Sequence, residues 1–210
     1  MARLCIADPP YPPAASVRFD RPGGRVVKRS RARRYYGDGT RPRQERPADF
    51  HPAAAEWDDP ARHAALAQQL ATEFDGWAIA TTPDGISAYG ELPEVRIMAW
   101  IKPNNPPTAH RIRGCWEAVL VCPPRDRRAG RAGDFVNDVL TAPSPRIGFV
   151  GAKPAAWTWW VLDALGYQPD TDDVIDLFPG SGGVQAAVSA YPTRLPLRPR
   201  EVMMEGVQRA

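Results

Sequence analysis

Residues 173–188 read DVIDLFPGSGGVQAAV and place a short apolar run, a glycine-rich turn and a helix-forming run in direct succession. A short apolar run of this kind is typical of a buried parallel strand. A strand, a glycine turn and a helix in this order direct backbone N–H groups and a helix N-terminus at a ligand. Glycine suits the turn because a side chain would hold the ligand away from the backbone. The alternative interpretation is a turn with a purely structural role.

A second short apolar run, residues 4–7, ends in the tetrapeptide Asp8-Pro9-Pro10-Tyr11. The two prolines remove two N–H donors and hold the chain extended. A carboxylate and an aromatic ring are therefore predicted at the carboxyl edge of a strand, where ligands bind in open α/β sheets. The alternative is a strand that ends in an ordinary proline-rich loop.

The chain between these two stretches alternates between predicted helices and strands. Helices are predicted from Pro60 onward, over 86–92 and over 155–165, where Gly166 ends the last one. Strands are predicted over 77–80, 95–101 and 116–121, whereas 123–144 is interpreted as a loop and His63 as a surface residue. This alternation predicts an α/β fold with a doubly wound, mostly parallel sheet, in a single domain over residues 1–210.

The overall composition narrows the class of protein. At 210 residues and 43% hydrophobic content, the chain is long enough to bury one sizeable core. Its three cysteines, Cys5, Cys115 and Cys122, show no CxxC spacing, which argues against a disulfide framework or a structural zinc site. No run approaches the roughly 18 apolar residues of a membrane helix. We therefore predict a cytoplasmic protein without a membrane partner.

Residues 17–47 form a strongly basic segment, with eleven arginine and lysine residues against three acidic ones. The segment has almost no aliphatic periodicity, which predicts a mobile insertion outside the core. Arginines next to tyrosines suit phosphate contacts and base stacking, although a solvated loop without a partner is the alternative. The candidate nucleic-acid-binding residues are Arg29, Arg31, Arg33, Arg34, Tyr35 and Tyr36.

Together, these stretches resemble the N-4/N-6 DNA methylases, the S-adenosylmethionine-dependent amino-methyltransferases that act on adenine N6 or cytosine N4. The tetrapeptide Asp8-Pro9-Pro10-Tyr11 matches the family's catalytic motif, residues 176–182 match its cofactor loop, and Lys153-Pro154 matches a third element. Residues 100–107 and 117–121 resemble its middle strands. The catalytic motif precedes the cofactor motif, as in the permuted beta-type members. The resemblance thus implies a circularly permuted, Rossmann-like methyltransferase sheet.

The resemblance also implies a reaction, the methylation of adenine N6 in double-stranded DNA, because the tetrapeptide begins with aspartate rather than serine. Asp8 and the carbonyl of Pro9 would accept hydrogen bonds from the amine of a flipped base, Pro10 would keep that carbonyl fixed, and Tyr11 would stack on the base. The sulfonium methyl of S-adenosylmethionine is already activated, so no metal is implied. The implied cofactor-binding residues are Lys153, Pro154, Asp176, Phe178, Gly180, Ser181 and Gly182.

Several alternatives remain open at this point. One is a cytosine-N4 or RNA amino-methyltransferase. Another is a catalytically weak nucleic-acid-binding relative, favoured by the proline-rich tail after Ala190, where the family has a further strand with an acidic residue for the ribose. A P-loop nucleotidase is disfavoured because no Lys-Ser/Thr pair follows the glycines. A dinucleotide oxidoreductase is disfavoured because no complete βαβ unit follows them.

Overall fold

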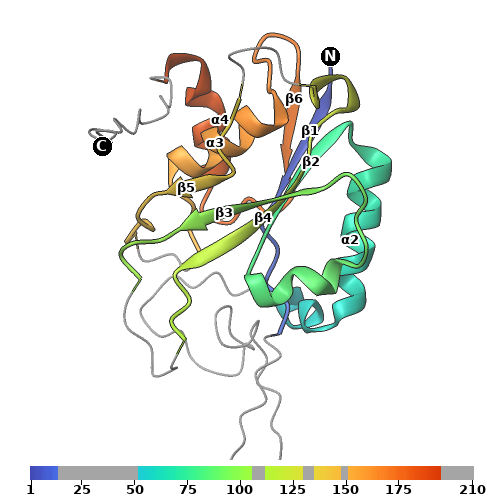
Figure 1. Ribbon diagram of the computed structural model, residues 1–210, viewed down its shortest axis with the longest axis vertical. Coiled ribbons are helices and arrows are strands. Elements are labelled where there is room, and N and C mark those ends of the chain that lie inside the picture. Colours follow the sequence, from blue (N-terminus) through green and yellow to red (C-terminus); the bar gives the residue numbers. More distant parts are fainter. Residues whose placement is uncertain (14–51, 106–111, 130–134, 148–150, 195–210) are drawn as a thin grey trace, which may run out of the picture.

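The computed structural model describes residues 1–13, 52–105, 112–129, 135–147 and 151–194. These residues form a six-stranded sheet with helices on both faces (Figure 1). The strand order is β5-β3-β4-β2-β1-β6. The strands are β1 (Arg3–Ala7), β2 (Gly76–Thr81), β3 (Arg96–Ile101), β4 (Trp116–Cys122), β5 (Val139–Thr141) and β6 (Asp173–Asp176).

The sheet is mostly parallel. Strand β1 runs parallel to β2 and β6, and β3 runs parallel to β5, whereas β4 is antiparallel to both of its neighbours, β2 and β3. Five of the six described strands therefore point the same way. The predicted α/β class and mostly parallel sheet are confirmed.

Strand β5 corrects the prediction that 123–144 is a loop. Its three residues are exposed or half-buried, so they carry no apolar pattern that would have revealed a strand. Backbone hydrogen bonds hold it instead, from Ala99 N to Asp138 O at 2.8 Å and from Ala142 N to Ile101 O at 3.1 Å. A short edge strand can form through such ladder contacts without a buried face.

The helices begin and end where capping residues stand. Helix α2 (Pro60–Glu73) is capped by Asp59, whose carboxylate accepts a hydrogen bond from Ala61 N at 3.0 Å. Helix α3 (Ala155–Leu165) ends at Gly166, which has the left-handed φ of 66° that glycine tolerates best. The remaining helices are α4 (Gly183–Ala190) and the 3₁₀ helices η1 (Pro52–Asp58), η2 (Pro83–Tyr89), η3 (Arg125–Arg127) and η4 (Tyr191–Thr193). The helix predicted over 86–92 overlaps η2, which starts and ends earlier.

Each face of the sheet carries its own apolar core. Helices α3 and α4 cover one face, where Trp157 and Leu162 pack against Leu4 and Ile6. Helix α2 and η2 cover the other, where Leu70 and Tyr89 belong to one cluster with Ile79. Trp157 and Trp160 of α3 are core residues, and their three-residue spacing places them on one side of the helix. Within the described ranges, no helix is long and apolar enough to cross a membrane.

His63 is buried, and its prediction as a surface residue was wrong. Its Nε2 lies 2.8 Å from the carbonyl of Trp57 and its Nδ1 lies 3.3 Å from the hydroxyl of Tyr89. Because a carbonyl only accepts, Nε2 carries the proton and Nδ1 accepts from Tyr89. Burial lowers the pKa of His63, which favours this neutral form. Helices η1 and η2 supply the two partners, and a pattern within α2 alone could not reveal them.

A buried ion pair fastens the sheet at the amino ends of β1 and β6. The side chain of Asp172 has no exposed surface and accepts hydrogen bonds from Ala2 N and Gln168 N, both at 2.8 Å. Arg127 of η3 donates hydrogen bonds to both carboxylate oxygens of Asp172 and also to the carbonyl of Gly166. Burial by itself would raise the pKa of Asp172, but these hydrogen bonds outweigh it and lower the pKa to about 2. We call Asp172, Arg127 and their backbone partners the Asp172 clasp.

Candidate active site

Three segments meet at the carboxyl edge of β1 and β6. Asp8 follows β1, the glycine turn follows β6, and Lys153 precedes α3. The two strands are parallel neighbours, with Ile6 opposite Asp176, so the segments after them leave the sheet side by side. Together they line a narrow pocket of about 30 Å³. Its lining consists of Asp8, Gly151, Ala152, Lys153, Phe178, Pro179, Gly180, Ser181, Gly183 and Val184.

Lys153 forms an ion pair with Asp8. Its Nζ donates to Asp8 Oδ2 at 2.5 Å, to Gly151 O at 3.0 Å and to the hydroxyl oxygen of Tyr11 at 3.1 Å. Only 2% of the Lys153 side chain is exposed, against 21% for Asp8. An ammonium group has three N–H donors, so these contacts use all of them. The resemblance implies that Lys153 binds the cofactor; in the structure, Lys153 lines the pocket with the glycine turn, and its ammonium also contacts the catalytic candidate Asp8.

Two further charged residues extend this ion pair into a cluster. The hydroxyl of Tyr11 donates to Glu117 Oε2 at 2.8 Å, and Glu117 Oε1 accepts a hydrogen bond from Lys102. The Nζ of Lys153 lies 3.8 Å from Glu117 Oε2. We call Asp8, Tyr11, Lys102, Glu117 and Lys153 the charged cluster. Its two carboxylates and two ammonium groups balance.

The charged cluster includes two residues that sequence reasoning missed. Lys102 follows β3 and Glu117 lies in β4, where the antiparallel register sets Trp100 opposite Glu117. A usable signal was present, because Glu117 is an isolated acidic residue in the apolar run of residues 116–121. A carboxylate in such a run is buried only with partners, which points to a polar site.

The pKa values of the two carboxyl groups move in opposite directions. Burial raises the pKa of Asp8, and the opposing charge of Lys153 offsets this only in part. Burial also acts to raise the pKa of Glu117, but there the charges of Lys153 and Lys102 prevail and lower it. Neighbouring acids whose pKa values are pushed apart are typical of functional sites.

The glycine turn has a geometry that only glycine adopts easily. Gly180 and Gly182 have φ angles of 44° and 74°, and Gly182 N donates to Pro179 O at 2.6 Å. Helix α4 starts at the next residue, so Gly183 and Val184 bring the N–H groups of its first turn to the pocket. The turn can therefore hold a negatively charged group at a helix N-terminus.

Asp176 presents an unused acceptor at the base of this turn. Its Oδ1 accepts from Phe178 N at 3.1 Å, whereas its buried Oδ2 has no hydrogen-bond partner among the described residues. Burial raises the pKa of Asp176. A buried acceptor without a partner is costly, and a ligand that donates to Asp176 Oδ2 would remove this cost.

The other predicted site residues have the following places. Pro9 and Pro10 are buried, and Pro154 is the N-cap residue of α3, where its carbonyl accepts from Trp157 N at 2.9 Å. Phe178 lines the pocket, and its ring meets that of Trp57 edge-on with centroids 5.1 Å apart. The candidate nucleic-acid-binding residues, Arg29, Arg31, Arg33, Arg34, Tyr35 and Tyr36, lie outside the described residues.

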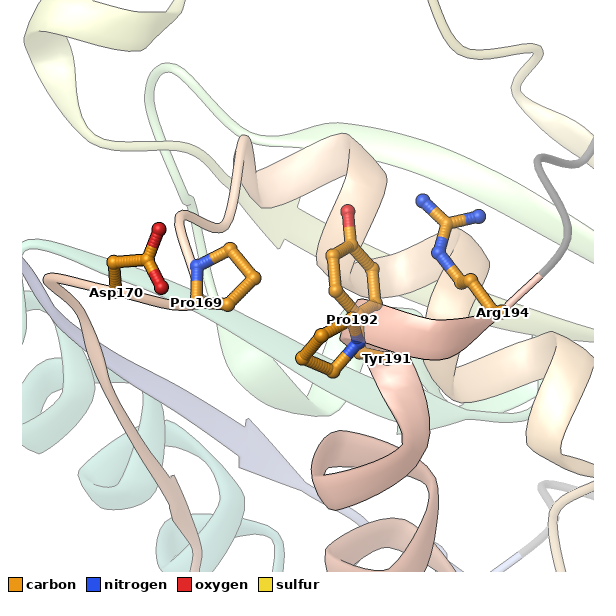
Figure 2. Close-up of a pocket in the computed structure, with 5 residues that line it drawn as sticks. All are labelled: Pro169, Asp170, Tyr191, Pro192 and Arg194. Carbon is orange, nitrogen blue, oxygen red and sulfur yellow. The ribbon is translucent and has the colours of Figure 1, made fainter.

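A larger pocket of about 360 Å³ is formed by the loop before β6 and by η4 with the residue that follows it. Figure 2 shows its lining, Pro169, Asp170, Tyr191, Pro192 and Arg194. The guanidinium of Arg194 stacks on the ring of Tyr191 at 4.1 Å and pairs with Asp163. The narrower pocket is the better candidate for chemistry, because it joins opposed charges with a helix N-terminus.

Comparison of the chain with protein-family models and with curated proteins gave no match. The functional interpretation therefore rests on the residues of the site and their geometry.

Proposed function

We propose that this protein is an S-adenosylmethionine-dependent methyltransferase that methylates the exocyclic N6 amine of adenine in DNA. One observation carries the proposal. Asp8 of the catalytic tetrapeptide lines the same pocket as Gly180 and Ser181 of the cofactor loop, although more than 170 residues separate them. The two motifs were matched to the family independently, and a shared pocket is what a transfer between two bound molecules requires.

The tetrapeptide supplies the acceptors for the amine. An aromatic amine is a poor nucleophile because its lone pair is delocalised into the ring. A carboxylate and a fixed carbonyl that accept its two N–H groups favour the pyramidal form, in which the lone pair is available for the methyl group. Asp8 and the carbonyl of Pro9 take these roles, and Pro10 restricts the backbone that carries the carbonyl. Tyr11 stacks on the flipped base, with its hydroxyl held by Glu117 and Lys153.

The residues of the glycine turn fit S-adenosylmethionine. Asp176 Oδ2 is a buried acceptor that still needs a donor, and the cofactor carries an ammonium group and ribose hydroxyls. The N–H groups at the start of α4 suit its carboxylate. When bound, the cofactor supplies an activated methyl group. Asp176, Phe178, Gly180, Ser181 and Gly182 would hold it, with Lys153 and Pro154 beside them. At about 30 Å³ the pocket holds roughly one water molecule, so the cofactor would extend beyond it or widen it.

The basic segment at 17–47 supports a nucleic acid as the partner. It begins six residues after Tyr11, so the base-stacking candidate and the basic residues are close along the chain. Neutralising Arg29, Arg31, Arg33 and Arg34 together should weaken DNA binding and flatten its dependence on salt. With fewer phosphate contacts, fewer counterions are released when the protein binds. Binding measured from 50 to 300 mM salt tests this. If the dependence of DNA affinity on salt concentration is unchanged, the basic segment does not contact the DNA.

A second candidate function is that of a nucleic-acid-binding relative without transfer activity. The contact that favours it is the ion pair between Lys153 and Asp8, which neutralises the catalytic carboxylate in this conformation. The narrow pocket also favours it.

Tritium transfer from labelled S-adenosylmethionine to unmethylated DNA separates the two candidates. We expect counts with the wild type and none with Asp8→Ala, which should still bind the cofactor in calorimetry. Digestion to nucleosides then distinguishes N6-methyladenine from N4-methylcytosine, and an RNA substrate run in parallel tests that alternative. Equal transfer by the variant would refute the role of Asp8. If the wild type shows no transfer and no cofactor binding, the second candidate, a binding relative without transfer activity, is favoured.

A further inference from the structure

The place that the target amine needs on Asp8 is occupied by a side chain of the protein itself. This inference rests on the proposed function, in which the carboxylate of Asp8 accepts a hydrogen bond from the amine. The ammonium of Lys153 lies 2.5 Å from Asp8 Oδ2, the distance of a strong charge-assisted hydrogen bond. Lys153 is almost fully buried, so water does not replace it readily. An amine that binds Asp8 must therefore displace Lys153 or share the carboxylate with it.

Glu117 provides a second carboxylate to which Lys153 can move. Its Oε2 lies 3.8 Å from Lys153 Nζ, and the hydroxyl of Tyr11 already contacts both groups. A charge-assisted hydrogen bond is about 2.8 Å long, so a shift of about 1 Å would bring Nζ into contact with Glu117. The flexible side chain of lysine allows a shift of this size.

We propose that Lys153 is a positioning residue that occupies Asp8 in the free protein and moves to Glu117 when the target amine binds. No proton is transferred, and the charge of the cluster stays balanced throughout. Before the shift, Lys153 pairs with Asp8 and Lys102 pairs with Glu117. After the shift, both ammonium groups share Glu117, and Asp8 accepts from the amine. A positive charge is thereby moved away from the nitrogen that becomes positive during methyl transfer.

This arrangement also favours bases that carry an exocyclic amine. Breaking the contact between Lys153 and Asp8 leaves a half-buried carboxylate that needs a new donor. An adenine amine supplies that donor, whereas a purine base without the amine does not. The site therefore favours the base that carries the amine, because only that base supplies Asp8 with a donor in place of Lys153.

Affinities for two single-stranded oligonucleotides test the proposal without cofactor or transfer. One contains adenine, and in the other every adenine is replaced by purine, which lacks the amine. The wild type should bind the adenine strand more tightly. Glu117→Gln weakens the second acceptor and should lower the adenine-to-purine affinity ratio about tenfold, toward one. Lys102→Met removes the competing cation from Glu117 and should raise the ratio.

The opposite directions of these two changes distinguish movement of Lys153 from a merely structural role. If the charged cluster only supported the fold, both variants would lower the ratio or leave it unchanged, and either result would overturn the proposal. A wild type without preference for adenine would overturn it as well. If Glu117→Gln does not fold, Lys102→Met still gives a decisive direction. If the two variants change the affinity ratio in opposite directions but the protein transfers no methyl group, the role of Lys153 stands and the proposed function is rejected. If the protein transfers methyl groups but both variants change the ratio in the same direction, the proposed function stands and the role of Lys153 is rejected.

Discussion

Asp8 and Asp172 lie at opposite edges of the same sheet, and their carboxylates have opposite environments. Asp172 precedes β6, is fully paired by Arg127 and two backbone N–H groups, and has its pKa lowered to about 2. Asp8 follows β1, depends on Lys153 for its charge and has its pKa raised. The first carboxylate has all the donors that it needs, and the second depends on a single cation. The difference is the one expected if the amino edge serves stability and the carboxyl edge serves the proposed chemistry.

Removing the charge of Asp172 should have the largest effect on folding. Asp172→Asn leaves the guanidinium of Arg127, whose side chain is 12% exposed, without its carboxylate, and breaking a largely buried pair costs about 3 kcal/mol. Urea unfolding at pH 7 measures the loss, with Asp170→Asn as a control at an exposed neighbouring aspartate. A change below about 1 kcal/mol would show that the Asp172 clasp is not a structural fastening.

The matched change at the carboxyl edge should affect transfer rather than folding. Asp8→Asn keeps the shape and an acceptor for Lys153, but it removes the charge that stabilises the reacting amine. If the proposed function holds, methyl transfer should fall about 10²–10³-fold. The free energy of unfolding should change by less than about 1 kcal/mol, because burial already destabilises the charged form of Asp8 and because Glu117, 3.8 Å from Lys153 Nζ, remains as a counter-charge for the ammonium. A large loss of stability with unchanged transfer per folded molecule would make Asp8 a structural residue.

Lowering the pH should change the contributions of Asp172 and Asp8 to folding stability in opposite directions. The folded pKa of Asp172, about 2, lies below its ordinary value of 3.8, so its contribution to stability is present above pH 4 and is lost as the pH falls through 2. This contribution amounts to roughly 2 kcal/mol. The pKa of Asp8 is raised, so its protonation as the pH falls favours the folded state. The stability advantage of wild type over Asp172→Asn should therefore shrink between pH 4 and pH 2, whereas an advantage that grew there would contradict the assignment.

Alanine substitutions at two glycines with left-handed backbones should show the smallest difference between the two edges of the sheet. Gly166 belongs to the Asp172 clasp and has a φ of 66°, and a Cβ there would come within 3.2 Å of Arg127 Cδ. Gly182 lies in the glycine turn at φ 74°, where a Cβ would meet no atom of the described residues within 4 Å. Alanine at either position should cost about 1–2 kcal/mol in backbone strain, with Gly166→Ala the more costly. In calorimetry only Gly182→Ala should weaken cofactor binding. Equal weakening by both would show that strain is transmitted across the sheet.

The sequence was sufficient to predict the elements whose apolar pattern matches their burial. The strand at residues 4–7, the helix from Pro60 and the helix over 155–165 were predicted in this way. Strand β5 was missed because its backbone contacts leave no pattern in the side chains. The antiparallel direction of β4 could not be predicted either, since an apolar run has the same pattern in both directions.

The site was predictable as two motifs at one edge but not as a network of contacts. The placement of Asp8 and the glycine turn follows from two parallel strands and short motifs. The contact between Asp8 and Lys153 joins residues 145 apart, and it depends on side-chain reach that no local pattern encodes. The charge of Glu117 within an apolar run was the missed signal, because its burial requires the cations that the structure places around it.

The measurement that tests the account most directly is methyl transfer per folded molecule, beside urea unfolding, for Asp8→Asn and Asp172→Asn. We predict a crossed result, in which Asp8→Asn unfolds like the wild type but transfers about 10²–10³-fold less, and Asp172→Asn is about 3 kcal/mol less stable but transfers normally where it is folded. If both variants lose stability and transfer together, the two edges of the sheet do not have separate roles. The central claim would then be wrong.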